Sequence, residues 1–234
     1  MAEAIDLPEA TYDSQRRPSL FAEELRALVD FLPFIVHLIR RNVTARYKRS
    51  ALGVLWTLLD PLATMVIMAV VFSHLFGRDI PAYPIFLLTA ILVWNFIAQA
   101  STSSILDLLS GSWLIGKAYV PRSVFVMSAV GSHLINFLIS LIPLTVIALF
   151  FGFESKPALL LLPFSLLLII LFTAGLGLLV SALAVFYNDV QNIYSIGLRL
   201  VIYLSGIFYT VEALPEAYRP LILLNPVYNL IQLF

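Results

Sequence analysis

The residue types that usually carry out chemistry are few in this sequence and lie far apart. The segment Gly111-x4-Gly116-Lys117 has the outline of a phosphate-binding loop. However, Ala118 follows where such a loop needs a Ser or Thr hydroxyl for Mg²⁺. The three histidines are widely separated, and no cysteine is present to act as a nucleophile or a thiolate ligand. We therefore expect no catalytic residue, no metal site and no cofactor bound by this chain.

The composition predicts a membrane protein. Hydrophobic residues make up 61% of the 234 residues, and charged residues make up only 12%, against about 25% in ordinary soluble domains. The 14 Lys and Arg residues balance the 14 Asp and Glu residues, so no basic excess exists to neutralise the phosphates of a nucleic acid. These values argue against a soluble globular domain, a disordered chain and a nucleic-acid-binding protein.

Five segments have the length and apolar character of membrane-spanning helices, which need roughly 20 mainly apolar residues. They are residues 53–76, 84–106, 123–151, 158–186 and 191–211. With the N-terminus in the cytoplasm, most basic residues fall on the cytoplasmic side, as the positive-inside rule requires. Residues 107–122 then form a cytoplasmic loop. Residues 213–229 contain three prolines and are expected to form a broken, re-entrant hairpin on the outer side.

The basic residues are concentrated just before the first expected span. Residues 1–30 are mainly acidic and predict a solvated tail. Residues 31–52 mix apolar side chains with bases and no acid, which favours an amphipathic helix lying in the membrane surface over an ordinary basic flank. The bases expected to contact anionic headgroups are Arg40, Arg41, Arg46, Lys48 and Arg49. The expected fold is therefore all-α: this tail and helix, a bundle at 53–212, and an outer hairpin with the start of a sixth span at 213–234.

Two charged residues, Asp60 and Arg199, fall within expected spans. Because a charge in hydrocarbon is costly, each should face the bundle interior, a partner or water. Each could line a pathway or could belong to a structural ion pair. Aromatic side chains could line the same path through contacts with sugar rings, or they could serve packing and the interfacial belt. The candidate path residues are Trp56, Asp60, Tyr194, Arg199, Tyr203, Phe208 and Tyr209.

Four motifs, in order along the chain, resemble those of the permease subunits of bacterial type-2 ABC exporters for polysaccharide (O-antigen, capsular polysaccharide or teichoic acid). The first is Arg46-Tyr47-Lys48-Arg49-Ser50-Ala51-Leu52-Gly53-Val54-Leu55-Trp56, followed by Asp60-Pro61-Leu62. The second is Leu114-Ile115-Gly116-Lys117-Ala118-Tyr119-Val120-Pro121-Arg122, and the third is Phe186-Tyr187-Asn188-Asp189-Val190. The fourth runs from Phe208-Tyr209 through Leu214-Pro215 to Asn225-Pro226. The resemblance covers residues 34–234, with Asn188 standing where the family usually has Arg.

The resemblance implies a multi-pass protein of the bacterial inner membrane that works as a homodimer with two copies of a separate ATPase subunit. ATP and Mg²⁺ would be bound by that ATPase, and the cargo would be a lipid-linked glycan threaded between the two permeases. The interfacial helix and the 107–122 loop would dock onto the ATPase, in the manner of an amphipathic segment in a groove. The expected coupling residues are Trp113, Leu114, Ile115, Lys117, Tyr119 and Arg122.

Three other functions remain open from the sequence. The first is a type-2 ABC permease for another cargo, such as a drug or a lipid. The second is a secondary transporter, which would ordinarily show paired repeats with broken helices. The third is a membrane enzyme acting on polyprenyl lipids, which would need clustered acids or histidines at the membrane face. Polysaccharide export is the function that the motifs favour.

Overall fold

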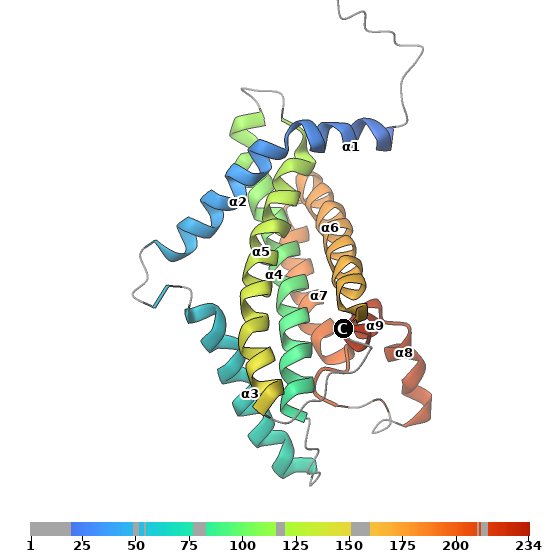
Figure 1. Cartoon of the computed structure of the whole chain (residues 1–234). Helices are drawn as coiled ribbons and strands as arrows, with labels where there is room; N and C mark the ends of the chain where they lie inside the picture. The colour runs from blue at the N-terminus through green and yellow to red at the C-terminus, as the bar shows by residue number, and fades with distance from the viewer. Residues whose placement is uncertain are drawn as a thin grey trace, which may run out of the picture.

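A computed structural model describes most of the chain after its N-terminal 19 residues (Figure 1). The described residues are 20–48, 52–53, 55–76, 83–115, 120–150, 160–209, 211 and 215–234. Within these ranges every regular element is a helix, which confirms the all-α class. The elements are α1 (Leu20–Asp30), α2 (Leu32–Tyr47), α3 (Leu55–Phe76), α4 (Tyr83–Ile115), α5 (Arg122–Phe150), α6 (Leu162–Phe186), α7 (Val190–Leu204), η4 (Glu216–Tyr218), α8 (Arg219–Leu223) and α9 (Pro226–Leu233).

Three helices are long and apolar enough to cross a membrane within the described residues: α4 as far as Gly111, α5 and α6. Two further helices coincide with the first and fifth expected spans: α3 (Leu55–Phe76), whose described side chains are apolar over Leu55–Met68, and α7, which is apolar over Val190–Leu204. The apolar runs therefore predict the positions of the helices, while the count of five spans stays a prediction.

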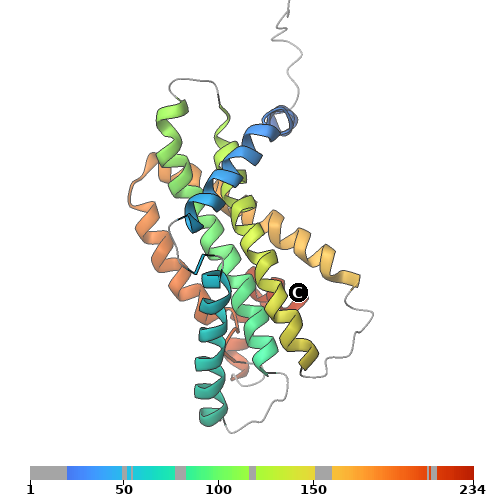
Figure 2. The same cartoon turned by 60° about the vertical axis from the view of Figure 1, so that its left-hand side comes forward.

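Helix α4 forms the centre of the bundle. It packs against α5, α6 and α3, and both views show these neighbours around it (Figures 1 and 2). Its Leu87, Leu88, Val93 and Ile97 are almost fully buried. Helix α6 approaches closely at Gly177, where an added Cβ would meet side chains of α4 and α5. A small residue at this position lets the backbones come together, as is usual between membrane helices.

Helices α1 and α2 lie against the N-terminal half of α5. The α2 side chains Ile35 and Leu38 are buried in an apolar cluster with Val124 and Phe125 of α5 and Leu108 of α4. This packing explains why the apolar stripe that we read as membrane-facing is partly covered by protein. Residues Leu32–Tyr47 of the expected segment 31–52 form a helix, while its amphipathic character and its position in the membrane surface stay predictions.

Two expected boundaries are corrected by the structure. Residues 20–30 were expected within a solvated tail, but they form α1, and Glu24 accepts a hydrogen bond from the hydroxyl of Ser123. The second span was expected to end at residue 106, but α4 continues to Ile115. The first half of the expected 107–122 loop is therefore helical. Gly111 is accommodated within α4 because its missing side chain leaves room for the ring of Phe125.

The C-terminal region begins where α7 ends. We expected a helix to residue 211, but α7 ends at Leu204 and Gly206 adopts a φ of 60°, a left-handed conformation that breaks a helix and favours glycine. Asn225 holds the break, because its Nδ2 donates to the carbonyl of Leu204 at 3.0 Å. The same side chain accepts from the backbone N–H of Val227 and so caps α9. The short helices α8 and α9 fall within the expected hairpin, and its re-entrant position stays a prediction.

Candidate functional site

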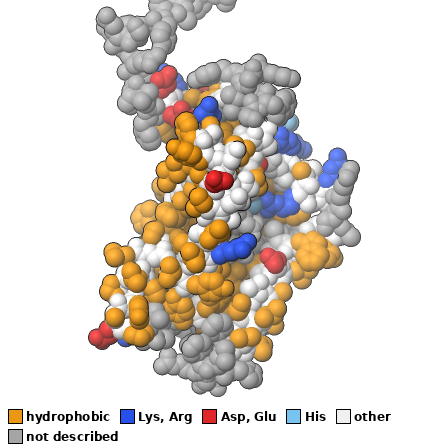
Figure 3. Space-filling model, turned by 180° about the vertical axis from the view of Figure 1, so that it is seen from behind, with side chains coloured by type: hydrophobic (Ala, Val, Ile, Leu, Met, Phe, Trp, Pro, Cys, Tyr) orange, Lys and Arg blue, Asp and Glu red, His pale blue; other side chains and the backbone are white. Residues whose placement is uncertain are grey.

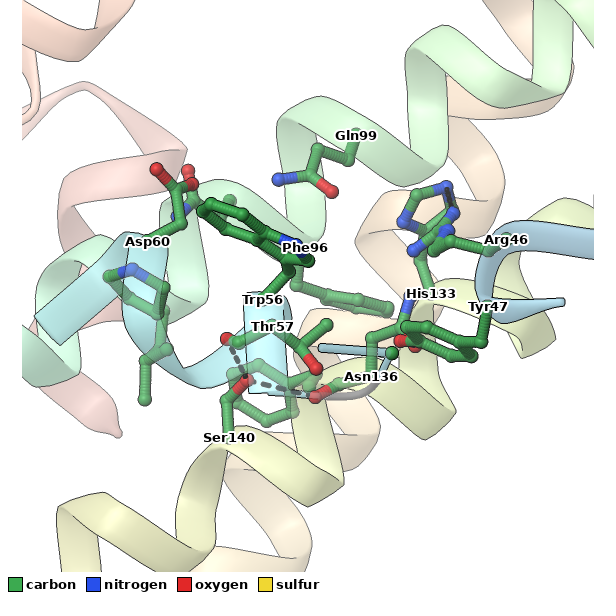
Figure 4. A pocket seen from close by; sticks show the side chains of 15 residues that line it. Arg46, Tyr47, Trp56, Thr57, Asp60, Phe96, Gln99, His133, Asn136 and Ser140 are labelled. Atoms are coloured by element: carbon green, nitrogen blue, oxygen red, sulfur yellow. Dashed lines mark hydrogen bonds between the residues drawn. The ribbon is translucent and has the colours of Figure 1, made fainter. Parts of the chain in front are cut away.

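A pocket with both polar and apolar walls lies where α2 and α3 meet α4 and α5. Its volume is about 400 Å³, within the range of small-molecule sites. Figure 4 shows side chains from all four helices around it. The pocket is lined by Arg46, Tyr47, Gly53, Trp56, Thr57, Asp60, Pro61, Leu92, Asn95, Phe96, Gln99, His133, Asn136, Phe137 and Ser140.

Helix α5 supplies one polar wall. His133, Asn136 and Ser140 are spaced three and four residues apart, so they share one face of the helix. All three are buried. Asn136 accepts a hydrogen bond from the Tyr47 hydroxyl at 2.7 Å, which joins α2 to α5.

Helix α3 lacks one backbone hydrogen bond, and Ser140 of α5 supplies a donor in its place. Pro61 lies inside α3 and has no N–H, so it cannot donate to the carbonyl of Thr57 four residues earlier. The Ser140 hydroxyl lies 3.2 Å from that carbonyl and 2.9 Å from the carbonyl of Asn136, and Figure 4 marks both contacts. A serine at this position therefore fastens α5 to the proline-containing turn of α3.

His133 receives hydrogen bonds at the other side of the pocket. The Arg46 Nη2 lies 3.2 Å from the His133 Nε2, and the Ser103 Oγ lies 2.8 Å from the same nitrogen. Because a guanidinium has only donors, Nε2 accepts and the ring proton belongs on Nδ1. Helices α2, α4 and α5 thus meet at one histidine.

One hydrogen-bond donor in the pocket has no partner among the described residues. The Asn136 Nδ2 is buried and has no hydrogen-bond partner among the described residues. A buried amide without a partner costs about 1–3 kcal/mol, so such an atom is a marker of a missing acceptor.

Opposite charges stand at the two ends of the pocket. In the close view Arg46 lies at one end and Asp60 at the other, with Trp56 and Phe96 between them (Figure 4). Arg46 and Asp60 are both exposed, and Trp56 is 56% exposed. From behind, charged side chains gather over the upper and middle parts of the molecule, while the lower part is mainly hydrophobic (Figure 3).

The arrangement is suited to binding. Amide and hydroxyl groups, an aromatic face and two opposite charges can hold a polar ligand. The described residues contain no group of three His, Asp or Glu side chains that could hold a metal ion.

The seven expected path residues do not form one group. Trp56 and Asp60 both line the pocket. On α7, the Tyr194 hydroxyl donates to the Ser101 Oγ of α4 at 2.6 Å, while Arg199 is exposed.

The remaining three path residues gather around the end of α7. The rings of Tyr203 and Phe208 have centroids 6.0 Å apart, and the Tyr209 hydroxyl donates to the carbonyl of Tyr203. The structure therefore separates the candidates into the pocket pair, the pair Tyr194 and Arg199, and this aromatic group, and the path itself stays a prediction.

The expected coupling and interfacial residues lie near the ends of three helices. Trp113, Leu114 and Ile115 form the last turn of α4, and Arg122 is exposed at the start of α5. The α2 segment and the residue after it carry Arg40, Arg41, Arg46 and Lys48 as exposed side chains. Lys117, Tyr119 and Arg49 lie outside the described residues.

The sequence interpretation missed the walls that α4 and α5 contribute to the pocket. Asn95 and Gln99 are four residues apart on α4, and His133, Asn136 and Ser140 share a face of α5. Polar residues at helical spacing inside an apolar segment are the signal that could have found them, because a polar face in a membrane helix must be turned to protein or water.

Comparison with known proteins agrees with the four motifs. A profile of the ABC-2 type transporter family matches residues 34–234. The chain is 30% identical to an O-antigen export system permease protein, RfbA, of Klebsiella pneumoniae over 84% of this chain and 76% of the relative. It is 28% identical to the protein of the same name from Myxococcus xanthus, over 88% and 80%. It is 22% identical to the polysialic acid transport protein KpsM of Escherichia coli, over 82% and 76%.

The helical membrane fold and these matches define the class, a transmembrane permease of an ABC transporter. The chain belongs to the ABC-2 type transporter family. The family resemblance read from the motifs is thus confirmed, and in this family ATP hydrolysis belongs to a separate subunit.

Proposed function

We propose that this chain is the permease subunit of an ATP-driven exporter that moves a lipid-linked polysaccharide from the cytoplasm across the inner membrane. The observation that carries the proposal is the similarity, over more than four fifths of the chain, to permeases named for O-antigen and polysialic acid transport. The polar and aromatic pocket supports it, since amides and aromatic faces suit sugar hydroxyls and sugar rings.

The working assembly in this proposal contains two copies of the chain and two ATPase subunits, and the five-span topology has a cytoplasmic N-terminus. ATP binding draws the ATPases together, and their motion reaches the bundle through residues 107–122 and α2. The packing of α2 supports this route. Ile35 and Leu38 are buried against α5, and Asn42 donates to Asp107 of α4 at 3.0 Å, so α2 cannot move without moving both helices.

Cargo would pass along the aromatic and charged side chains of the first and fifth spans. Trp56 and Asp60 on α3 would meet the cargo at the pocket, and the group around Tyr203 would meet it at the end of α7. The ATPase must bind two permease states with different affinity, since otherwise ATP binding would drive no motion. A rocking or shearing of packed helices is the kind of motion that such a bundle allows.

The test is purification of the chain from its native membrane in mild detergent, with mass spectrometry of co-purifying proteins. We expect a stoichiometric soluble ATPase with vanadate-sensitive turnover. Deletion of the chain should then make a lipid-linked glycan accumulate inside the cell, and re-expression should reverse the accumulation. A co-purifying ATPase without any glycan accumulation would point to another ABC cargo. A chain that purifies alone, under conditions that preserve other ABC complexes, would contradict the proposed assembly.

A further inference from the structure

We propose that the pocket between α2, α3, α4 and α5 binds the headgroup of a zwitterionic phospholipid with a primary amine, its phosphate toward Arg46 and its ammonium toward Asp60. The proposal goes beyond the export function, because it concerns a lipid of the surrounding bilayer that occupies the pocket when no cargo is there. It rests on the charges, the unpaired amide donor and the depth of this pocket.

The pocket carries a cation and an anion that are separated from each other. Arg46 and Asp60 lie at opposite ends of the pocket (Figure 4), and the described residues form no ion pair between them. The hydrogen bond that Arg46 makes goes to the ring of His133. The nearby carboxylate of Asp107 accepts from Asn42 and attracts Arg46 without a described ion-pair contact between them. The site therefore offers one cation and one anion to a ligand. A ligand with both charges, such as a phosphate and an ammonium, satisfies both at once.

The pocket also contains a hydrogen-bond donor without a partner among the described residues, the side-chain amide of Asn136. The Asn136 side chain is only 7% exposed, and its Nδ2 has no partner among the described residues. Its Oδ1 accepts a hydrogen bond from the Tyr47 hydroxyl. The free N–H groups need an acceptor, and a phosphate oxygen beside Arg46 is one that the cation also attracts.

An aromatic side chain, Trp56, lines the pocket near Asp60. Trp56 is more than half exposed and stands one helical turn before Asp60 on α3. The face of an indole attracts a cation, and a carboxylate accepts hydrogen bonds from a primary ammonium. The two side chains together favour an amine headgroup over a headgroup that carries only the phosphate charge.

The position of the pocket relative to the membrane surface also favours a lipid headgroup. The pocket lies where the basic segment of α2 ends and the apolar helix α3 begins. That junction is the level at which Arg, Lys and Trp side chains meet lipid headgroups. Since Arg46, Trp56 and Asp60 are exposed, a lipid can enter from the bilayer with its acyl chains along the apolar surface of α3, where Val66 and Ile67 are exposed.

Native mass spectrometry of the full chain, purified with the subunits that accompany it, can measure the retained lipids. The protein is exchanged into phosphatidylethanolamine, phosphatidylcholine and phosphatidylglycerol with identical acyl chains. We expect preferential retention of phosphatidylethanolamine. Asp60→Asn should lower its ratio to phosphatidylglycerol about threefold, in line with the loss of one partly exposed charge pair. Arg46→Gln should lower retention of all three lipids, because each carries the phosphate.

Matched controls separate the pocket from general electrostatics. Arg26→Gln removes an exposed charge of α1 outside the pocket, and Asp189→Asn removes an exposed acid before α7. Neither should change the lipid ratio. Equal retention of the three lipids by the wild-type chain would overturn the proposal, as would an unchanged ratio in Asp60→Asn. Displacement of the lipid by inorganic phosphate as effectively as by soluble phosphoethanolamine at equal concentration would assign the pocket to a bare anion and overturn the proposal. Unchanged elution and thermal melting establish that the variants fold.

Discussion

The close approach of α6 to α4 and α5 predicts that two neighbouring glycines respond oppositely to the same substitution. A Cβ added at Gly177 would lie 2.7 Å from the Oγ of Ser104 and 3.2 Å from a methyl group of Val126, both of which are buried. A Cβ added at Gly175, two residues earlier on the same helix, would meet nothing within 4 Å. The two glycines therefore isolate packing from helix propensity.

The magnitude follows from the groups that must move. The Ser104 hydroxyl donates to the carbonyl of Ala100 at 2.8 Å, so turning it away breaks a buried hydrogen bond worth about 0.5–1.5 kcal/mol. Overpacking of a filled core costs about 1–3 kcal/mol. Replacing Gly by Ala in a helix gains up to about 1 kcal/mol at both positions. We expect Gly177→Ala to be less stable than Gly175→Ala by about 1–3 kcal/mol.

Thermal melting followed by size-exclusion chromatography in one detergent gives the comparison. At roughly 2–4 °C per kcal/mol for a chain of this size, Gly177→Ala should melt several degrees below Gly175→Ala, which should match or exceed the wild type. Ser104→Ala combined with Gly177→Ala should recover part of the loss, because the 2.7 Å contact is gone. Equal melting temperatures for the two glycine variants, or no recovery in the double variant, would refute the packing argument.

Three further predictions concern the ends of the bundle and the pocket. Aspartate at both Trp113 and Leu114 should leave ATP hydrolysis of the purified complex intact while glycan export falls to background, and surviving export would contradict the coupling role. Tyr47→Phe deprives the Asn136 amide of its described donor and should lower stability by about 1–3 kcal/mol, measured by melting. Asn225→Ala removes the α9 cap and the bonds to the end of α7 and should cost at least about 1 kcal/mol. Asn225→Asp keeps the capping acceptor and should melt between this variant and the wild type.

The sequence predicts where the helices lie better than where they end. Apolar runs beginning at residues 84 and 123 correspond to α4 and α5, which begin at Tyr83 and Arg122. Hydropathy, however, indicates which stretch of a helix can lie in the hydrocarbon core of the bilayer, and not where the helix ends. Helix α4 therefore continues to Ile115 through a polar stretch. Helix α7 ends early for a local reason that hydropathy does not register, the left-handed Gly206.

The types of single residues are not enough to predict which side chains line the pocket. Trp56 and Asp60 could be chosen because a charge and an aromatic side chain in a span are unusual, and both line the pocket. Their neighbours could not be chosen in the same way, because Asn136 and His133 become informative only when α5 is rotated so that both face α2. Arg46 was assigned to headgroups alone, and the structure adds its hydrogen bond to His133.

The separation of the path candidates has the same origin. Lipid tails are as apolar as leucine, so the bilayer does not determine which apolar faces of two helices meet. The orientation is selected by small residues such as Gly177 and by polar pairs such as Tyr47 with Asn136 and Tyr194 with Ser101. The hydroxyl of Tyr194 is engaged with α4, while Trp56 belongs to the α3 wall of the pocket. Polar residues within apolar helices therefore determine both the packing and the location of the site.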